Sequence, residues 1–339
     1  MTHISYAETS SMDANPVLSI CVPTFNRPQL LEECLQSIVR SLEGIEDTVE
    51  IVISDNASEK ATAEVATRFV RNHQNASYFR NERNVLDENF YLAMERARGR
   101  FVWVLGDDDQ ITADAIRLVL EKVRAGHDLI ICQYSVMSPD FSRVLQKRGL
   151  PIASPSLLND RDAVLAIYST TLGFISCSVT HRQRFLSVPT AERDRFMECG
   201  ASFLYCVYAS APVNCRPALI ESPVVLYRSG IARFDDDHWV RTFVIGLASA
   251  VHALAQYGYS TQAIRKARNK NILYNVIRRL VLLKMNNRPL QAAAAALAAN
   301  YRDCPQYWLQ CRPVLLLPRW SLALARAMKR AIGNSAAAA

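Results

Sequence analysis

The stretch Phe101-Val-Trp-Val-Leu-Gly-Asp-Asp-Asp-Gln110 places three carboxylates directly after an apolar run. Residues 101–105 are β-prone and predict a strand, which Gly106 ends by letting the chain turn. Open α/β sheets hold their ligands at the carboxyl ends of their strands, so the acidic cluster lies where an active site is expected. Three adjacent acids repel one another unless a cation lies beside them, and a divalent metal is the natural candidate.

Strands and helices alternate on both sides of this stretch. Strands are predicted at 18–22, 49–54, 77–80, 101–105 and 128–134. Helices are predicted at 29–42, 61–72, 88–98 and 112–125, the last with Thr112 as its cap. Such repetition predicts an α/β fold with a doubly wound, mostly parallel sheet and right-handed crossovers.

The composition indicates a globular protein in a reducing compartment. With 339 residues, half of them hydrophobic, the chain can bury a full core. The nine cysteines contain no C-x-x-C pair, which fits neither a disulfide framework nor a zinc cluster. No charged-then-apolar leader opens the sequence and no apolar run is long enough to span a bilayer, so we expect a cytoplasmic protein.

Charge divides the chain into two parts. From Thr261 onward there are 14 Lys and Arg residues and one acid, Asp303, whereas acids outnumber bases before it. We predict a loose tail at 1–16, an α/β domain at 17–240 and a helical, basic region at 241–335. The segment after Val136, which contains several prolines and serines, is expected to be a linker or a flap.

Polar loops follow four of the predicted strands. They are Pro23 to Arg27, Asp55 to Ser58, Asn81 to Asn89, and Gly106 to Asp109. Each alone is weak support for a site, because Asn, Asp and Ser also form ordinary turns and caps. Their shared location at the carboxyl ends of strands favours a ligand site.

These motifs resemble the family 2 glycosyltransferases with the GT-A fold. The resemblance lies in Leu18-Ser-Ile-Cys-Val-Pro-Thr-Phe-Asn-Arg27, Val49-Glu-Ile-Val-Ile-Ser-Asp-Asn-Ala-Ser58 and Leu105-Gly-Asp-Asp-Asp109, in family order and spacing. Tyr78 to Asn84 and Asn89-Phe90 also match, and the combination is similar to the abequosyltransferase-like branch. The resemblance is strong over residues 17–135 and faint beyond, so it informs donor chemistry better than acceptor chemistry.

The resemblance implies a role for each loop. The nucleotide would contact Pro23, Thr24, Asn26, Arg27, Asp55, Asn84, Asn89 and Asp107, with Asp55 accepting a pyrimidine N–H and Arg27 beside the base. Asp107 and Asp109 would form the D-x-D pair that holds Mn²⁺ or Mg²⁺ on the donor diphosphate. Gly106 stands where many family members have the first acid of the motif. The register of the acids is therefore ambiguous, and the role of Asp108 in metal binding is left open. His238 would join the metal, or else lie in a solvated acidic loop.

A general base is expected between the sheet and a later helix. Glu198 lies about where inverting members place a carboxylate, and Asp194 is the competitor. Either residue also fits an ordinary first-turn acid that the helix dipole favours.

The sequence therefore predicts a metal-dependent glycosyltransferase. It would move a sugar from a nucleotide-diphosphate donor to a hydroxyl of a lipid-linked oligosaccharide or surface polysaccharide precursor. The alternatives are a catalytically inactive nucleotide-sugar-binding or scaffold protein and a metal-dependent nucleotidyltransferase, although the first loop lacks the glycines that the latter usually needs. No nucleic-acid reader motif is present.

The basic C-terminal region predicts contact with an anionic membrane surface, with the protein peripheral at its inner face. Two helical faces motivate this: Leu273, Val276, Ile277, Leu280 and Leu283 form one, and Trp320, Leu324 and Met328 the other. The alternative is that both faces pack on the rest of the protein.

Overall fold

The computed structural model describes residues 16–231 and 235–321. Its sheet has nine strands in the order β3-β2-β1-β4-β8-β6-β9-β5, with β7 paired to β6. The strands are β1 Leu18–Thr24, β2 Val49–Asp55, β3 Ala76–Arg80, β4 Phe101–Val104, β5 Gln110–Ile111, β6 Leu129–Met137, β7 Val144–Gln146, β8 Ser178–His181 and β9 Pro217–Arg228. β1 to β4 pair in parallel and β6 pairs in parallel with β9, whereas β8 is antiparallel between β4 and β6. The predicted mostly parallel α/β sheet is confirmed.

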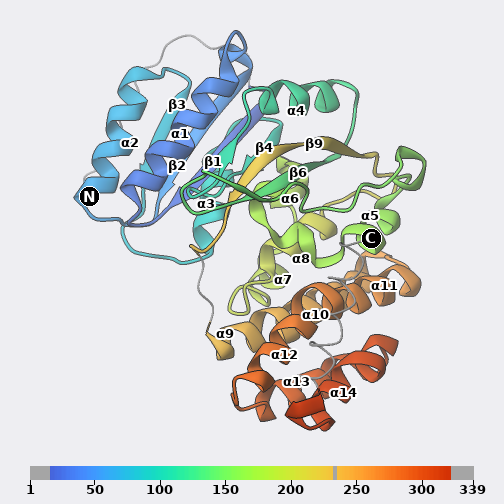
Figure 1. Ribbon diagram of the computed structural model, residues 1–339. Helices are drawn as coiled ribbons and strands as arrows, with labels where there is room; N and C mark the ends of the chain where they lie inside the picture. The colour runs from blue at the N-terminus through green and yellow to red at the C-terminus, as the bar shows by residue number, and fades with distance from the viewer. Residues whose placement is uncertain (1–15, 232–234, 322–339) are drawn as a thin grey trace, which may run out of the picture.

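Helices cover both faces of the sheet and continue into a separate layer below it (Figure 1). Those of the first half are α1 Pro28–Leu42, α2 Lys60–Asn72, α3 Glu88–Arg96, α4 Ala115–Arg124, α5 Arg161–Tyr168, α6 Arg182–Leu186, α7 Thr190–Asp194 and α8 Ser202–Ala209. Those of the second half are α9 Asp236–Trp239, α10 Leu247–Ala253, α11 Thr261–Asn271, α12 Ile277–Met285, α13 Gln291–Tyr301 and α14 Arg312–Leu316. π-helical turns at Val240–Gly246, Ile272–Val276 and Tyr307–Cys311 adjoin α10, α12 and α14.

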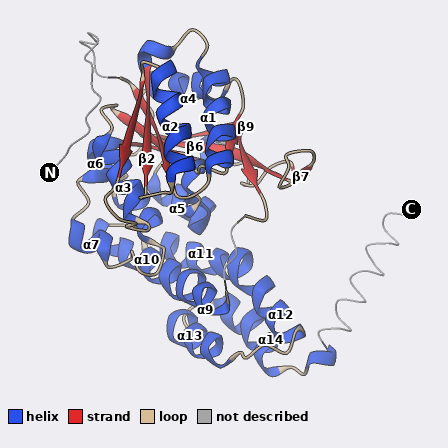
Figure 2. Ribbon diagram, turned by 90° about the vertical axis from the view of Figure 1, so that its left-hand side faces the viewer, coloured by secondary structure: helices blue, strands red, loops and turns tan. Residues whose placement is uncertain are grey.

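Alternate residues of each central strand point into two different cores. In β4, Phe101 and Trp103 pack with α1 and α4, whereas Val102 and Val104 pack on the opposite face with α3 and α8. Because both faces of these strands are buried, the strand sequences are almost continuously apolar. Figure 2 shows the helices on either side of the sheet.

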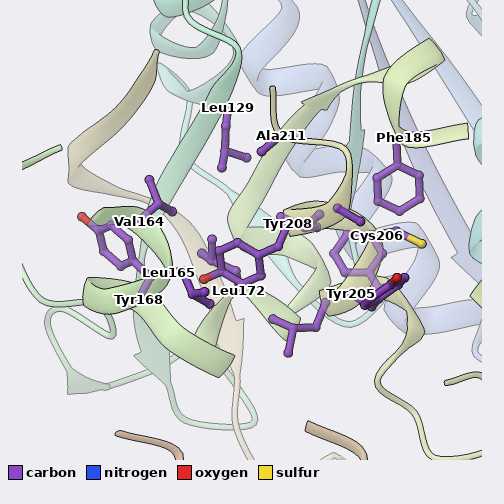
Figure 3. Close-up of a cluster of buried hydrophobic side chains, with 14 of the residues drawn as sticks. Leu129, Val164, Leu165, Tyr168, Leu172, Phe185, Tyr205, Cys206, Tyr208 and Ala211 are labelled. Atoms are coloured by element: carbon purple, nitrogen blue, oxygen red, sulfur yellow. The ribbon is translucent and has the colours of Figure 1, made fainter. Parts of the chain in front are cut away.

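The second of these cores is rich in aromatic side chains and joins the sheet to later helices. The residues drawn in Figure 3 come from this cluster and include Leu129, Val164, Leu165, Tyr168, Leu172, Phe185, Tyr205, Cys206, Tyr208 and Ala211. Helices α10 and α11 add Leu247, Val251 and Ile264 to the same cluster. The start of the helical region is therefore packed against the sheet half.

The remaining helices have a core of their own. Val276, Leu280 and Leu283 are at most 5% exposed and pack with residues of α13 and α14. Of the two alternatives for this apolar face, packing within the protein is what the structure has for these three residues, whereas Leu273 is 37% exposed. Trp320 is exposed, and Leu324 and Met328 lie outside the described residues.

Two local expectations need correction. Helix α4 begins at Ala115 with Asp114 before it, and Thr112 donates its hydroxyl to Asp114 Oδ1 at 2.6 Å instead of capping the helix. The segment after Val136 is no linker, because β7, β8 and β9 complete the sheet, but Pro139 in this segment accepts from Arg228 beside the acidic loop, so the flap alternative stays open. Most of the predicted tail, residues 1–15, lies outside the described residues.

Candidate active site

The four polar loops lie together because their strands are parallel neighbours. β3, β2, β1 and β4 are adjacent and run in the same direction, so the loops that follow them meet at one edge of the sheet. Hydrogen bonds join the loops directly: the Asn26 amide donates to Ser58 Oγ at 2.9 Å, and Thr24 Oγ1 donates to Asp107 Oδ2 at 2.7 Å. The strand-end placement expected from the sequence is what the structure has.

Asp107 is held by the loop after β1. Its carboxylate, 4% exposed as a residue, accepts from Thr24 Oγ1 and, at 2.9 Å, from the guanidinium of Arg27. Burial raises the pKa of Asp107 to about 6, although Arg27 and Thr24 oppose the shift. Thr24, Arg27 and Asp107, all assigned to the nucleotide, thus form one connected group.

Asp109 is held from the other side of the loop. Ser176 Oγ donates to its Oδ2 at 2.6 Å, and the amide of Arg228 donates to Oδ1 at 3.2 Å. Burial, reinforced by the charge of Asp108, raises the pKa of Asp109 to about 7 against these two hydrogen bonds. The same Ser176 hydroxyl accepts from the amide of Gly106 at 3.0 Å, which fixes the turn at the end of the strand.

Asp108 is the most accessible of the three acids. Its side chain is 20% exposed, against 6% for Asp107, and it lies 3.3 Å from the guanidinium of Arg27. Arg27 therefore bridges Asp107 and Asp108 and supplies part of the positive charge that the acidic run requires. A ligand approaching from solvent meets Asp108 before either neighbour.

Arg228 at the end of β9 organises the acidic loop, and the sequence did not reveal it. Its side chain is buried and donates Nε to the carbonyl of Asp108 at 2.9 Å. It also donates to the carbonyl of Pro139 and to Glu33 of α1, and its guanidinium carbon lies 4.2 Å above the Phe141 ring. One guanidinium thus ties the loop to α1 and to the hairpin between β6 and β7.

Asp55 is fully buried at the end of β2. Its Oδ1 accepts from the Ser58 amide at 2.9 Å and its Oδ2 from Tyr78 Oη at 2.7 Å, with Arg80 Nε 3.7 Å away. Both oxygens are engaged, so the Asp55 carboxylate faces the loop and Tyr78, and it would meet a base only if one of these partners moved. Arg80 is half exposed beside it and carries the charge toward solvent.

The asparagines of the third loop form a network with the end of β2. Asn89, 3% exposed, accepts from Ser54 Oγ at 2.7 Å and donates to the Ser54 carbonyl at 2.8 Å. Asn84 accepts from Asn56 Nδ2 at 2.8 Å and is exposed. Asn84 can therefore reach a ligand, whereas Asn89 positions the strand ends.

The first loop presents its polar atoms through an unusual backbone. Asn26 has φ +52°, a left-handed conformation that asparagine tolerates better than most residues, and its Oδ1 accepts from the Glu59 amide at 2.7 Å. Pro23 is half-buried just before the loop, and Phe25 is 40% exposed at its tip.

The two base candidates lie in neighbouring but different places. Glu198 is exposed in the turn before α8. Gly200 of this turn has φ +65°, and a Cβ there would lie 4.0 Å from Oδ2 of Asp87, in the loop after β3. Asp194 ends α7 next to Arg193, which lies 3.8 Å from Glu95, near the far end of α3. The turn that contains Glu198 therefore adjoins the loop after β3 at Gly200.

His238 lies near Asp87, in the loop after β3. Burial raises the pKa of Asp87, and His238 opposes that shift, which places the two groups within electrostatic reach. Asp235 caps α9 by accepting from the His238 amide at 2.7 Å, and Asp236 pairs with Arg279 and Arg288 at 2.7 Å each. Two of the three consecutive acids at 235–237 are thus used in helix capping and ion pairs.

The acidic loop fits a cation that arrives with a phosphate ligand. Its donors are carboxylate oxygens, which suit Mg²⁺ or Mn²⁺. Within residues 16–231 and 235–321, no three His, Cys, Asp or Glu side chains are grouped so that they could hold a metal ion, and the role of His238 stays a prediction. Mg²⁺ sites commonly use one or two carboxylates and complete the shell with substrate phosphate and water.

The sheet order, with an acidic loop after β4 beside β1, is consistent with a GT-A fold. The model of the family described as Glycosyl transferase family 2 matches residues 19–183. Residues 19–183 therefore form a family 2 glycosyltransferase domain, and the resemblance stated from the motifs is confirmed.

Two curated relatives match the same part of the chain. Abequosyltransferase RfbV of Salmonella typhimurium is 35% identical over 119 residues, covering 34% of this chain and 35% of that protein. The GalNAc(5)-diNAcBac-PP-undecaprenol beta-1,3-glucosyltransferase of Campylobacter jejuni is 29% identical over 161 residues, covering 45% and 49%. The chain thus spans between a third and a half of the length of these relatives.

Solved structures extend the likeness over most of the chain. S. aureus TarS has a TM-score of 0.56 at 16% identity and covers 91% of this chain and 52% of its own. The mannosyltransferase PcManGT from Pyrobaculum calidifontis, in complex with GDP-Man and Mn²⁺, has a TM-score of 0.52 at 16% identity and covers 95% and 88%. At this identity the likeness establishes the GT-A fold, as predicted.

Proposed function

We propose that the protein transfers a sugar from a nucleotide-diphosphate donor to a hydroxyl of a lipid-linked oligosaccharide or surface polysaccharide precursor. The observation that carries the proposal is the meeting of four polar loops and three carboxylates at one sheet edge within a family 2 glycosyltransferase domain. Both named relatives are glycosyltransferases, and the name of one of them contains an undecaprenol-linked oligosaccharide, which supports the acceptor class. The protein would act as a peripheral protein at the inner face of a membrane.

The donor nucleotide would lie over the loops after β1, β2 and β3. Pro23, Thr24, Asn26, Arg27 and Asn84 would contact it directly. Asp55 and Asn89 would act from beneath, since both are buried and hydrogen-bonded, with Asp55 orienting Tyr78 and Arg80. Asp55 would therefore support the residues that contact the base and would not contact the base itself.

Asp108, with Asp107 and Asp109 behind it, would hold Mn²⁺ or Mg²⁺ on the donor diphosphate. The cation would supply neutralisation of charge on the departing diphosphate. Arg27 bridges Asp107 and Asp108, so it would place a second positive charge at the same position. Asp108 would be the first of the three carboxylates to meet the cation, because its side chain is the most accessible.

In the reaction, the acceptor oxygen bonds to the anomeric carbon as the bond from that carbon to the diphosphate oxygen breaks. The acceptor proton passes to a carboxylate, for which Glu198 is the first candidate and Asp194 the second. Asp87 is a third carboxylate beside the Glu198 turn. Such a displacement inverts the anomeric centre, as family 2 resemblance favours.

Release of nucleoside diphosphate from a panel of UDP-, GDP-, CDP- and dTDP-sugars, with membrane lipid extract as acceptor and Mn²⁺ present, tests the proposal. One donor should be consumed with label appearing in the lipid fraction. Donor binding without any turnover would favour the inactive binding protein, and release of pyrophosphate from a nucleoside triphosphate would favour the nucleotidyltransferase. Glu198→Gln should lower kcat while donor binding is kept.

A further inference from the structure

The far end of the helical region carries an exposed apolar surface, which we name the α14 patch. Its members are large apolar side chains with 45–70% exposure: Trp308, Leu309, Leu316, Leu317 and Trp320. Figure 1 shows α14 at the end of the molecule opposite the sheet. A soluble surface rarely gathers so many exposed large apolar side chains in a segment of 13 residues, so the α14 patch indicates a binding surface.

The patch lies on the outer side of a helix whose inner side is already packed. Tyr307, Cys311 and Val314 face the core formed by the helical region itself and are at most 7% exposed. Leu309 in the π-helical turn and Leu316 at the end of α14 are each 70% exposed. This segment is apolar on both sides, so core packing does not explain the outer residues.

Two arginines, Arg312 and Arg319, adjoin the α14 patch. The guanidinium carbon of Arg312 lies 4.8 Å above the Trp308 ring, and Trp308 donates its indole N–H to the carbonyl of Arg302 at 2.7 Å. Arg319, two positions after Leu317, donates to Asn287 Oδ1 at 2.9 Å. The one acid in this stretch, Asp303, is paired with Arg268. The rim of the patch is therefore positive.

The exposed apolar side chains and the positive rim together indicate what binds the α14 patch. A second copy would bring another positive rim against the first, which like-charge repulsion disfavours. Nucleic acid would match the charge but would leave the leucines without apolar partners. An anionic lipid bilayer matches both, because leucine and tryptophan insert at the interface while arginine contacts the headgroups.

We propose that the α14 patch docks the protein on an anionic bilayer through Trp308, Leu309, Leu316 and Leu317. Docking would bring the active site to the proposed lipid-linked acceptor, so its role rests on the proposed function. The docking itself does not depend on that function. No helix within residues 16–231 and 235–321 can cross a bilayer, so this contact would be interfacial. The proposal replaces the buried α12 face as the anchor.

Flotation of the full chain with vesicles tests it, using phosphatidylcholine alone and phosphatidylcholine mixed with phosphatidylglycerol. The wild type should float with the mixed vesicles and dissociate at high salt. Leu309→Ser/Leu316→Ser should reduce the bound fraction on the order of tenfold. The control Leu145→Ser/Val213→Ser removes two apolar side chains of 53% and 70% exposure elsewhere and should float like the wild type.

Other occupants give different results. The proposal would be overturned if Leu309→Ser/Leu316→Ser bound the vesicles as well as the wild type does, or if the wild type did not float. Loss of binding only in Leu324→Ser/Met328→Ser would move the anchor outside the described residues, and stronger binding by that variant would mean that the chain's own end covers the patch. A dimer that Leu309→Ser/Leu316→Ser converts to a monomer would identify a second copy instead. Nucleotide binding by every variant, measured in parallel, separates these outcomes from failure of the proposed function.

Discussion

The sheet half and the helical half depart from the usual partition of side chains in opposite ways. At the carboxyl ends of the strands, Asp55, Asp107 and Asp109 are at most 4% exposed. At the end of the helical region, Leu309, Leu316 and Trp320 are 69–70% exposed. Burying a carboxylate costs folding free energy, whereas an exposed leucine contributes no stabilisation, so neither feature is explained by folding alone. We infer a charged ligand at the sheet and an apolar partner at the helices.

The two sites also differ in how they are held. Each buried carboxylate of the sheet site accepts hydrogen bonds from other elements, so its geometry is set before a ligand arrives. The leucines of the α14 patch need no such organisation, because apolar burial is not directional. Substitutions should therefore have sharp effects at the first site and graded effects at the second.

The largest effect is expected at Asp108. Asp108→Asn removes the charge of the most accessible acid while keeping its shape, and we expect kcat/KM for the preferred donor to fall about 100- to 1000-fold. Asp47→Asn, an exposed acid before β2 at the opposite edge of the sheet, is the control and should be silent. Full activity in Asp108→Asn would mean that the acidic loop is only structural.

A smaller loss is expected from Arg228→Met, which frees the acidic loop from α1 and from the hairpin. Displacement of the loop should raise the KM for the donor and lower kcat/KM about 10- to 100-fold, and Arg228→Lys should recover part of the loss. Arg268→Met is matched in burial and also breaks an ion pair, but it lies in the helical half. Both methionine variants should lower the melting temperature, and equal kinetics in the two would refute a positioning role for Arg228.

The pH dependence of stability should report the buried acids. Burial raises the pKa of Asp107 to about 6 and of Asp109 to about 7, above the ordinary value of 3.8. The folded state then binds more protons than the unfolded state between about pH 4 and pH 7, so these groups contribute less stability as the pH rises through that window. Denaturant unfolding should find Asp109→Asn gaining stability relative to wild type from pH 5 to pH 8. A difference that is constant with pH would contradict the assignment.

The smallest effect on donor binding is expected from the helical core. Leu280→Ala leaves a cavity in the third cluster and should cost about 2–5 kcal/mol of unfolding free energy. Nucleotide affinity should stay within about twofold, because none of the strand-end loops packs on Leu280. A large loss of affinity would show that the helical half shapes the donor site and would weaken the comparison.

The strands that carry the site were predictable because they are buried on both faces. β1, β2 and β4 are short apolar runs bounded by turn residues, and their order fixes where the polar loops lie. β8 and β9 were missed because β8 is only four residues long and β9 contains Pro217 and Pro223, which mask a strand pattern.

The partners of the acidic loop could not be predicted in the same way. Ser176 and Arg228 meet Asp109 from 67 and 119 positions away, and neither belongs to a local motif. A strand end indicates where a carboxylate lies, but the residues that orient it are decided by packing between distant elements. The amphipathic pattern of α12 left two alternatives open for a related reason, since a periodic apolar face fits a neighbouring helix as well as a membrane.

Titration calorimetry with UDP, GDP, CDP and dTDP, in Mn²⁺ and in EDTA, tests most directly the claim that the strand ends form a metal-assisted donor site. One nucleoside diphosphate should bind with Mn²⁺ and lose on the order of tenfold or more in affinity with EDTA, and Asp108→Asn should abolish that difference without unfolding. Equal affinity with and without metal, or no binding by any of the four, would contradict the account.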